Sequence, residues 1–333
     1  MPTSRTTKPK LAVVYNPIKV DFERLKKTVN AAAKAAHWAP PIWFSTTEQD
    51  PGQGVASVAI GHGAKVVLAA GGDGTVRAVA EALRGSGVAI AVVPAGTGNL
   101  LARNLDLSTG NIHDSVAVAF KGYNRAIDLG MVGIVRDNDD HEEHAFLVMA
   151  GLGIDAKMIR NTSTKLKKAV GWLAYVDGIA RSIPELRPVH FNYSVDGAPN
   201  RSLTAHSVII GNCGALPGGL LLMPEAKPDD GILDMAVLVP RSLFGWVKIW
   251  NKVAWENGVL RKSAVGRSII DLSRDVREVR YETGRDFNMI LDSPEEFQLD
   301  GDEFGLVKSV RAWVDPGALV VRVRKARSES PIW

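Results

Sequence analysis

The chain has one cysteine among 333 residues, and this scarcity excludes a disulfide framework and any zinc site built from several cysteines. It also lacks an apolar run near the ~18 residues that a membrane-spanning helix needs. The apolar stretch after the basic N-terminus, Leu11–Tyr15, is too short for the hydrophobic core of a signal peptide. The sequence therefore predicts a soluble, cytoplasmic protein.

The chain also has little net charge. The 40 Lys and Arg residues and 36 Asp and Glu residues give a formal net charge of +4, and the basic residues are scattered along the chain. A nucleic-acid-binding protein usually concentrates its basic residues in one patch. We therefore expect no nucleic-acid partner, whereas the small basic excess is compatible with a nucleotide or an acidic lipid surface.

The first third of the sequence alternates strand and helix patterns, which is typical of a parallel sheet with helices on its faces. Apolar runs predict the strands, and segments rich in Ala and Leu predict the helices. The expected strands are 11–15, 41–44, 65–70 and 88–93, and the expected helices are 22–36, 55–60, 76–83 and 100–104.

After about Asp128, short strand-like runs alternate with turn residues, which is typical of an antiparallel sandwich. The acidic and His-containing stretch 137–144 is interpreted as a hairpin loop rather than a metal cluster. The expected strands are 129–135, 145–148, 189–195, 207–210, 233–239, 276–281, 288–291, 308–314 and 319–323, and helical insertions are expected near 166–183 and 243–259. The predicted fold class is thus α/β plus mainly-β.

The segment GGDGT (71–75) lies directly between an expected strand and an expected helix. Its glycines let the backbone approach a ligand closely, and the N–H groups that open the helix favour an anion such as phosphate. Asp73 suits phosphate binding if Mg²⁺ or a ribose hydroxyl intervenes. A purely structural turn is the alternative, and it would be favoured for two glycines alone.

A second glycine loop, PAGTGN (94–99), follows the next strand and precedes the next helix. Loops after neighbouring parallel strands project from the same edge of the sheet. Neither loop has the GK[ST] of a P-loop or the GxGxxG of a dinucleotide-binding fold. Together the two loops predict a site for nucleotide phosphates.

Four motifs occur in a fixed order: GGDGT, PAGTGN-x-x-AR (94–103), P-x-A-x-x-DDG-x-LD (224–234) and LDGD (299–302). In these the chain resembles the bacterial diacylglycerol kinase and lipid kinase family, which also includes the sphingosine and ceramide kinases. The resemblance extends from Asn16-Pro17 to 316–319. GGDGT alone is less specific, because NAD kinases share it.

The resemblance implies an NAD kinase-like, ATP-binding α/β domain of residues 1–128, which residues 315–333 rejoin, and a β-rich lipid-substrate domain of residues 129–314. The residues implied for nucleotide binding are Asn16, Thr47 (preferred to Thr46), Gly71, Gly72, Asp73, Gly74, Thr75, Val76, Arg77, Gly96 and Thr97. A structural Mg²⁺ is implied at the carboxylate of Asp230 and the backbone carbonyls of Lys227 and Ile232.

Phosphoryl transfer requires cations on the phosphates and a group that accepts the hydroxyl proton. Asp73, Asp300 and Asp302 supply carboxylates for one Mg²⁺ and one base. The resemblance implies a Glu base in the position of Asp302, whose side chain is one methylene shorter, so Glu303 is an alternative base. The segment Asp300-Gly301-Asp302 also has the composition of a simple hairpin turn.

These features predict a transferase: an ATP- and Mg²⁺-dependent lipid kinase that converts diacylglycerol to phosphatidic acid in phospholipid metabolism. Such an enzyme would contact the inner face of the membrane transiently, and a homodimer is left open. The alternatives are an NAD kinase-like or sphingoid-type kinase, and an inactive nucleotide- and lipid-binding regulator. Trp246 and Trp250 lie on one face of an expected helix, which either packs in the core or faces lipid.

Overall fold

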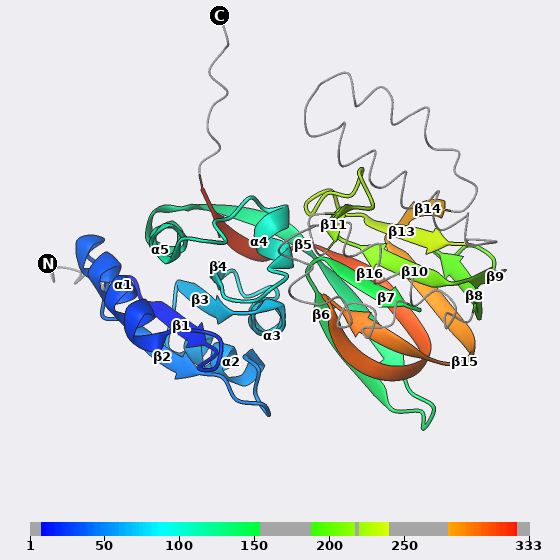
Figure 1. Cartoon of the computed structure of the whole chain (residues 1–333), viewed down its shortest axis with the longest axis horizontal. Coiled ribbons are helices and arrows are strands. Elements are labelled where there is room, and N and C mark those ends of the chain that lie inside the picture. The colour runs from blue at the N-terminus through cyan, green and yellow to red at the C-terminus, as the bar shows by residue number, and fades with distance from the viewer. Residues whose placement is uncertain (1–7, 154–187, 217–219, 240–278, 325–333) are drawn as a thin grey trace, which may run out of the picture. The chain divides into compact units, whose positions relative to one another are not determined.

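The computed structural model describes residues 8–153, 188–216, 220–239 and 279–324. By its internal contacts, the chain divides into two compact units, one of residues Met1–Ile127 and Gly317–Trp333, the other of residues Asp128–Pro316. The helices predicted near 166–183 and 243–259, including Trp246 and Trp250, lie outside the described residues. Figure 1 labels the elements along the chain.

The first unit contains a parallel sheet covered by helices. Its strands are β1 (Leu11–Tyr15), β2 (Ile42–Ser45), β3 (Val66–Gly71) and β4 (Ala89–Pro94), and its helices are α1 (Phe22–Ala35), α2 (Gln53–Gly61), α3 (Asp73–Leu83), α4 (Leu100–Asn104) and α5 (Ile112–Lys121). The strand order is β4-β3-β1-β2, and the end of β16 (Asp302–Val323) adds a parallel strand beside β4.

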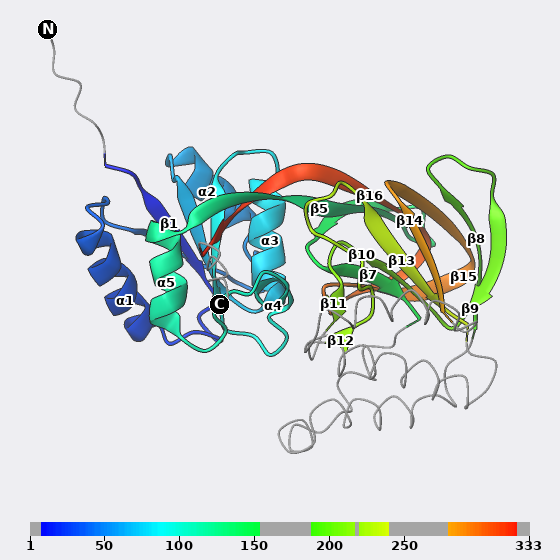
Figure 2. The ribbon, with the colours of Figure 1, turned by 90° about the horizontal axis from the view of Figure 1, so that it is seen from above.

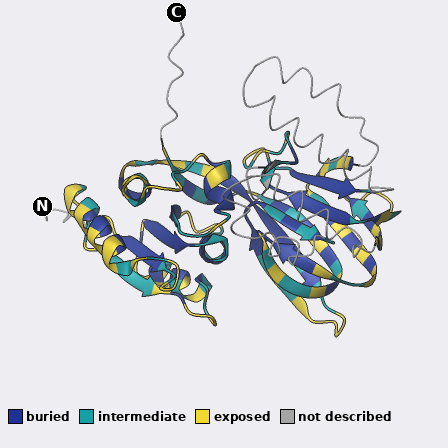
Figure 3. Cartoon of the chain, viewed as in Figure 1, coloured by how far each residue is buried: buried dark blue, intermediate teal, exposed yellow. Residues whose placement is uncertain are grey.

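Both faces of this sheet are covered, which explains why its strands are continuous apolar runs. Helices α1 and α5 lie side by side on one face, and α2 and α3 lie side by side on the other (Figures 1 and 2). Leu25 and Val29 of α1 and Val116 of α5 pack in one cluster with Val13 and Leu68 of the sheet. Figure 3 shows the buried strands and the exposed outer side of α1.

The second unit consists of β-strands in its described residues. They are β6 (His141–Phe146), β7 (Met149–Leu152), β8 (Val189–Val195), β9 (Arg201–Ala205), β10 (Ser207–Gly211), β11 (Ala215–Leu216), β12 (Leu220–Leu221), β13 (Leu233–Leu238), β14 (Val279–Gly284), β15 (Asp286–Leu299) and parts of β5 (Tyr123–Val135) and β16, both of which begin or end in the first unit. The order β14-β13-β10-β7-β15-β16 is antiparallel where its register is given, and β8-β9 and β5-β6 extend it.

The strands are parallel in the first unit and antiparallel in the second, and this mixed sheet confirms the predicted fold class. Strand β16 joins the two runs that were predicted as separate strands, 308–314 and 319–323. Helix α5 and strand β9 were not predicted. Helix α5 carries two valines and a phenylalanine, which are weak helix formers, so its packing on β4 decides its conformation rather than propensity.

The predicted hairpin loop 137–144 is partly wrong, because its second half forms strand β6 from His141 onward. Polar side-chain contacts take the place of an apolar pattern in this strand, one across the hairpin to Arg136 and one along β6 to His144. Glu142 accepts a hydrogen bond from Arg136 Nη2 (3.0 Å) and lies 3.0 Å from His144 Nε2. The Arg136 bond, followed by the His144 contact, lowers the pKa of Glu142 to about 2.

Candidate functional site

The carboxyl edge of the parallel sheet brings the predicted nucleotide-binding segments together. Tyr15 at the end of β1 pairs with both Ser45 and Ala70, and Gly71 at the end of β3 pairs with Pro94. The residues that follow these strands therefore share one edge, where open α/β sheets bind ligands. They include Asn16, Thr46 and Thr47, GGDGT and PAGTGN.

The two glycine loops touch each other. A Cβ placed on Gly96 would lie 2.8 Å from Gly72 Cα, so no side chain larger than hydrogen fits there. The Ala95 N–H donates a 2.8 Å hydrogen bond to the carbonyl oxygen of Gly71. The glycines thus serve a close approach of two backbones, and each loop fixes the position of the other.

Asp73 ties the second loop to the first. Its carboxylate accepts hydrogen bonds from the backbone N–H groups of Asn99 (2.8 Å) and Leu100 (2.5 Å), which open helix α4. A Cβ on Gly98 would lie 2.7 Å from Asp73 Oδ2. The Asp73 carboxylate therefore positions the loop at 94–99, in addition to any ligand that it contacts.

Helix α3 differs from its neighbours at its N-terminus. Asp21 caps α1, Asp50 accepts from the opening amides of α2, Asp73 serves α4 and Asn111 caps α5. The N-cap of α3, Gly72, makes no side-chain capping hydrogen bond. The N–H groups and the positive dipole end at the start of α3 favour an anion.

The other predicted nucleotide-binding residues surround this helix end or belong to it. Asn16 Oδ1 accepts from the amides of Ile18 and Lys19, and Thr47 Oγ1 accepts from the Asp50 amide. Thr97 is exposed in its loop. Arg77 is buried on α3, with its guanidinium 3.7 Å from the carboxylate of Glu81, four residues later in the helix.

In the second unit, Asp300 lies in the two-residue turn between β15 and β16. Asp300 and Gly301 have φ values of 50° and 89°, as a type I′ hairpin requires, and Leu299 pairs with Asp302. The carboxylate of Asp300 is buried and accepts hydrogen bonds from three consecutive amides, 147–149, at 2.8–3.0 Å. The segment is therefore a hairpin turn, and the Asp300 carboxylate also fixes its position against residues 147–149.

Asp302 differs from Asp300 in its surroundings. It is the first residue of β16 and is half-buried, and Glu303 beside it is exposed. Successive side chains on a strand point to opposite faces, so Asp302 and Glu303 cannot both face the same ligand. The turn, which Asp300 holds rigid, therefore presents one carboxylate of this pair to each side.

The predicted metal-binding residues surround a turn between residues 227 and 232. Gly231 has a φ of 74°, and its N–H donates a 2.6 Å hydrogen bond to Asp128 Oδ2. Asp230 Oδ1 accepts from the Ile232 N–H at 3.2 Å. Carboxylate and backbone carbonyl oxygens are the ligand types that Mg²⁺ prefers, and Lys227, Asp230 and Ile232 offer both types.

The local electrostatics suit a cation near this turn. Asp234 is buried in β13, and its burial together with the charges of Asp230 and Glu225 raises its pKa to about 6. A bound cation would relieve this crowding of negative charge. Across the described residues, no three His, Cys, Asp or Glu side chains form a metal-binding group.

Two residues of this region were missed from the sequence, Asp128 and Asn212. The Asp128 N–H donates to the Pro228 carbonyl (2.6 Å), and its carboxylate holds Gly231. Asn212 is fully buried, and its Nδ2 donates to the carbonyl oxygens of Asp128 (3.0 Å) and Leu147 (3.1 Å). Asn212 is thereby bonded both to Asp128, which contacts the turn at 227–232, and to the segment that holds Asp300. The sequence offered one signal for Asp128, a single charged residue inside the apolar run 127–135.

Comparisons with known proteins identify a family for each unit. Residues 10–132 match the model of the diacylglycerol kinase catalytic domain, and residues 148–323 match that of the YegS C-terminal NAD kinase beta sandwich-like domain. No helix within the described parts of the chain is long and apolar enough to cross a membrane.

Three similar proteins illustrate the match. A "Diacylglycerol kinase" of Mycobacterium tuberculosis is 26% identical over 68% of this chain and 72% of its own length. A "Probable lipid kinase YegS-like" of Pseudomonas fluorescens is 34% identical over 68% of this chain and 73% of its own. A diacylglycerol kinase structure from Bacillus anthracis str. Sterne covers 97% of this chain and 99% of its own, with a TM-score of 0.66 and 17% identity. The chain belongs to the diacylglycerol kinase and YegS-like lipid kinase family.

Proposed function

We propose that the protein is an ATP- and Mg²⁺-dependent kinase that phosphorylates the hydroxyl group of diacylglycerol and produces phosphatidic acid. The observation that carries the proposal is the N-terminus of α3, which opens at GGDGT without a side-chain cap. This helix end suits a phosphate. Membership of the lipid kinase family points to a lipid alcohol as the acceptor.

We assign the donor nucleotide to the first unit. The amides at 72–75 bind the phosphates of ATP, with Thr97, Asn16 and Thr47 at the same edge of the sheet. Asp73 acts mainly as a positioning residue, because its carboxylate is bonded to the amides of Asn99 and Leu100. Because the Asp73 carboxylate and the phosphates are both negative, a cation between them would reduce their repulsion.

We assign the base to Asp302. In the proposed reaction the lipid hydroxyl oxygen forms a bond to the γ-phosphorus of ATP, and the bond from that phosphorus to the bridging oxygen breaks. ADP leaves, and the hydroxyl proton passes to the carboxylate of Asp302. Asp300 holds the turn in place through three amides and is therefore a positioning residue rather than the base.

The residues at 227–232 fit a divalent cation. Asp230 would bind Mg²⁺ with the carbonyl oxygens of Lys227 and Ile232. The pKa of Asp234 is raised by its burial and, second, by the charges of Asp230 and Glu225, which a cation would offset. Mg²⁺ bound there would stabilise the turn, and Mg²⁺ on the nucleotide supplies positive charge to the phosphate oxygens.

The test is transfer of radiolabelled phosphate from ATP to a panel of acceptors: diacylglycerol, ceramide, sphingosine and NAD. We expect labelled phosphatidic acid from diacylglycerol, in a reaction that EDTA abolishes. Label in NAD alone would assign the chain an NAD kinase activity instead. ATP binding without transfer to any acceptor would support the inactive regulator.

A further inference from the structure

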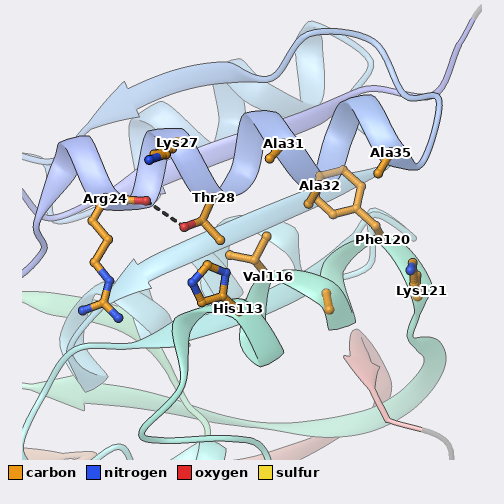
Figure 4. A pocket seen from close by; sticks show the side chains of 11 residues that line it. Arg24, Lys27, Thr28, Ala31, Ala32, Ala35, His113, Val116, Phe120 and Lys121 are labelled. Atoms are coloured by element: carbon orange, nitrogen blue, oxygen red, sulfur yellow. Dashed lines mark hydrogen bonds between the residues drawn. The ribbon is translucent and has the colours of Figure 1, made fainter.

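A surface groove of about 450 Å³ runs between helices α1 and α5 of the first unit (Figure 4). The two helices pack on the sheet through Leu25, Val29 and Val116, so their outer sides remain at the surface. Residues of both helices line the groove along its length. The groove thus lies on the helical layer and not at the carboxyl edge of the sheet.

The floor of the groove is apolar and made of small residues. Ala31 and Ala35 of α1 are exposed along it, and Ala117 of α5 is exposed opposite them. Phe120 closes the end beside Ala32 and Ala35 (Figure 4). Longer side chains at the alanine positions would fill the space, so the choice of alanine keeps an apolar channel open to solvent.

The rim of the groove is basic. Arg24 and Lys27 of α1 and His113 and Lys121 of α5 line it, and no acidic residue from the described parts of the chain does. Asp114, beside His113, lies 3.0 Å from the guanidinium of Arg324, which offsets its charge.

Helix α1 is a strongly basic helix. It contains four Lys and Arg residues and one Glu, a net charge of +3, whereas the whole chain of 333 residues carries +4. Helix α2 in the opposite helical layer, with the sequence QGVASVAIG, has no charged residue. Helix α1, on the side of the first unit where the groove lies, is therefore more basic than α2 on the other side.

We propose that the α1–α5 groove and its basic rim form the surface with which the protein binds anionic phospholipid bilayers. The cations contact lipid phosphates, and the alanine floor accommodates the apolar part of the interface. A lipid kinase needs such a surface to reach a substrate held in a bilayer. The inference rests on the proposed function, but binding to vesicles can be measured without ATP or diacylglycerol.

The experiment is co-sedimentation of the full chain with phosphatidylcholine vesicles that either contain or lack phosphatidylglycerol. We expect binding to the anionic vesicles that weakens as salt is added. Each cation near an anionic surface contributes about a fivefold factor to binding, so the Lys27→Gln/Lys121→Gln variant should bind about 25-fold more weakly.

A matched control is Lys65→Gln/Lys308→Gln, which removes the same charge from exposed positions that do not line the groove. We expect this variant to bind vesicles nearly as the parent protein does. A third variant, Ala31→Asp, places a carboxylate on the floor and should also weaken binding. Circular dichroism and thermal unfolding verify that each variant is folded.

Three results would overturn the proposal: no binding of the parent protein to anionic vesicles, equal binding by the groove and control variants, or a dimer in analytical ultracentrifugation that the groove variant abolishes. The last result would assign the groove to a second copy of the chain. Activity on detergent-solubilised diacylglycerol should be equal in all variants. If that activity is absent while vesicle binding is present, the proposed function fails and the membrane surface stands.

Discussion

Asp73 in the first unit and Asp300 in the second each direct a carboxylate toward backbone amides of a distant segment. Asp73 accepts from two amides that open α4 and is half-buried, whereas Asp300 accepts from three consecutive amides and is 5% exposed. Charge-assisted bonds to buried amides are among the stronger hydrogen bonds in proteins. Both residues were predicted as catalytic, and in the structure both hold loops in place.

The difference in burial separates two roles. The bonds of Asp73 lie at the carboxyl edge of the parallel sheet, the proposed nucleotide site, so its loss should affect ligand binding as much as folding. The bonds of Asp300 lie inside the second unit, so its loss should affect folding first. Asp302 shares the turn with Asp300 and is only half-buried, and this position suits a reactive group better than a structural one.

The largest expected effect on stability is that of Asp300→Asn. The substitution turns an NH₂ donor or a neutral oxygen toward three amide donors and leaves at least one of them without a good acceptor. We expect the free energy of unfolding to fall by at least about 3 kcal/mol. Urea denaturation measures it, and an Asp300→Asn protein as stable as its parent would contradict the structural role.

Asp234 offers the opposite case, a buried carboxylate near two other acids. Its pKa is raised from 3.8 to about 6 by burial and by Asp230 and Glu225, so its stabilising contribution is present below pH 4 and lost as the pH rises through 6. At pH 8 in EDTA, Asp234→Asn should be more stable by up to about 3 kcal/mol. At pH 4 the variant and parent should unfold alike.

The pH series also tests the cation site. Mg²⁺ bound at Asp230 would favour the charged form of Asp234 and lower its pKa. Added Mg²⁺ should therefore reduce the advantage of the Asp234→Asn variant at pH 8. An unchanged difference between variant and parent would argue against a cation at this turn.

Asp73→Asn should have a smaller effect on stability, about 1–2 kcal/mol, because two amides are involved and the site is less buried. The same variant should weaken ATP binding, since the loop at 94–99 loses its anchor. Isothermal titration of ATP and urea denaturation measure the two effects. A loss of stability as large as that of Asp300→Asn, with ATP affinity unchanged, would remove the contrast between the two aspartates.

The sequence predicts much of the first unit, because strands covered on both faces are continuous apolar runs such as 66–71. Helix α5 and strands β6 and β9 escape prediction, because α5 is rich in valine and His141–His144 is polar. Their conformations depend on packing and on cross-strand bonds such as that between Arg136 and Glu142.

The positions of the loops are predictable from the sequence, but the contacts between them are not. Asp73 meets the amides of Asn99 and Leu100 across more than 25 residues, and Asp300 meets the segment at 147–149 across about 150. Motif spacing carries no information on such contacts. The sequence therefore identifies three candidate catalytic aspartates, and the hydrogen bonds indicate which two of them serve as anchors.

The most direct test compares phosphate transfer to diacylglycerol by the parent protein, by Asp302→Asn and by Glu303→Gln. We expect Asp302→Asn to keep the parent's urea midpoint and ATP affinity while its kcat falls by about 10²–10⁴. Glu303→Gln should remain within a few-fold of the parent. Undiminished transfer by a folded Asp302→Asn protein, or a loss confined to Glu303→Gln, would contradict the assignment of Asp302 as the base.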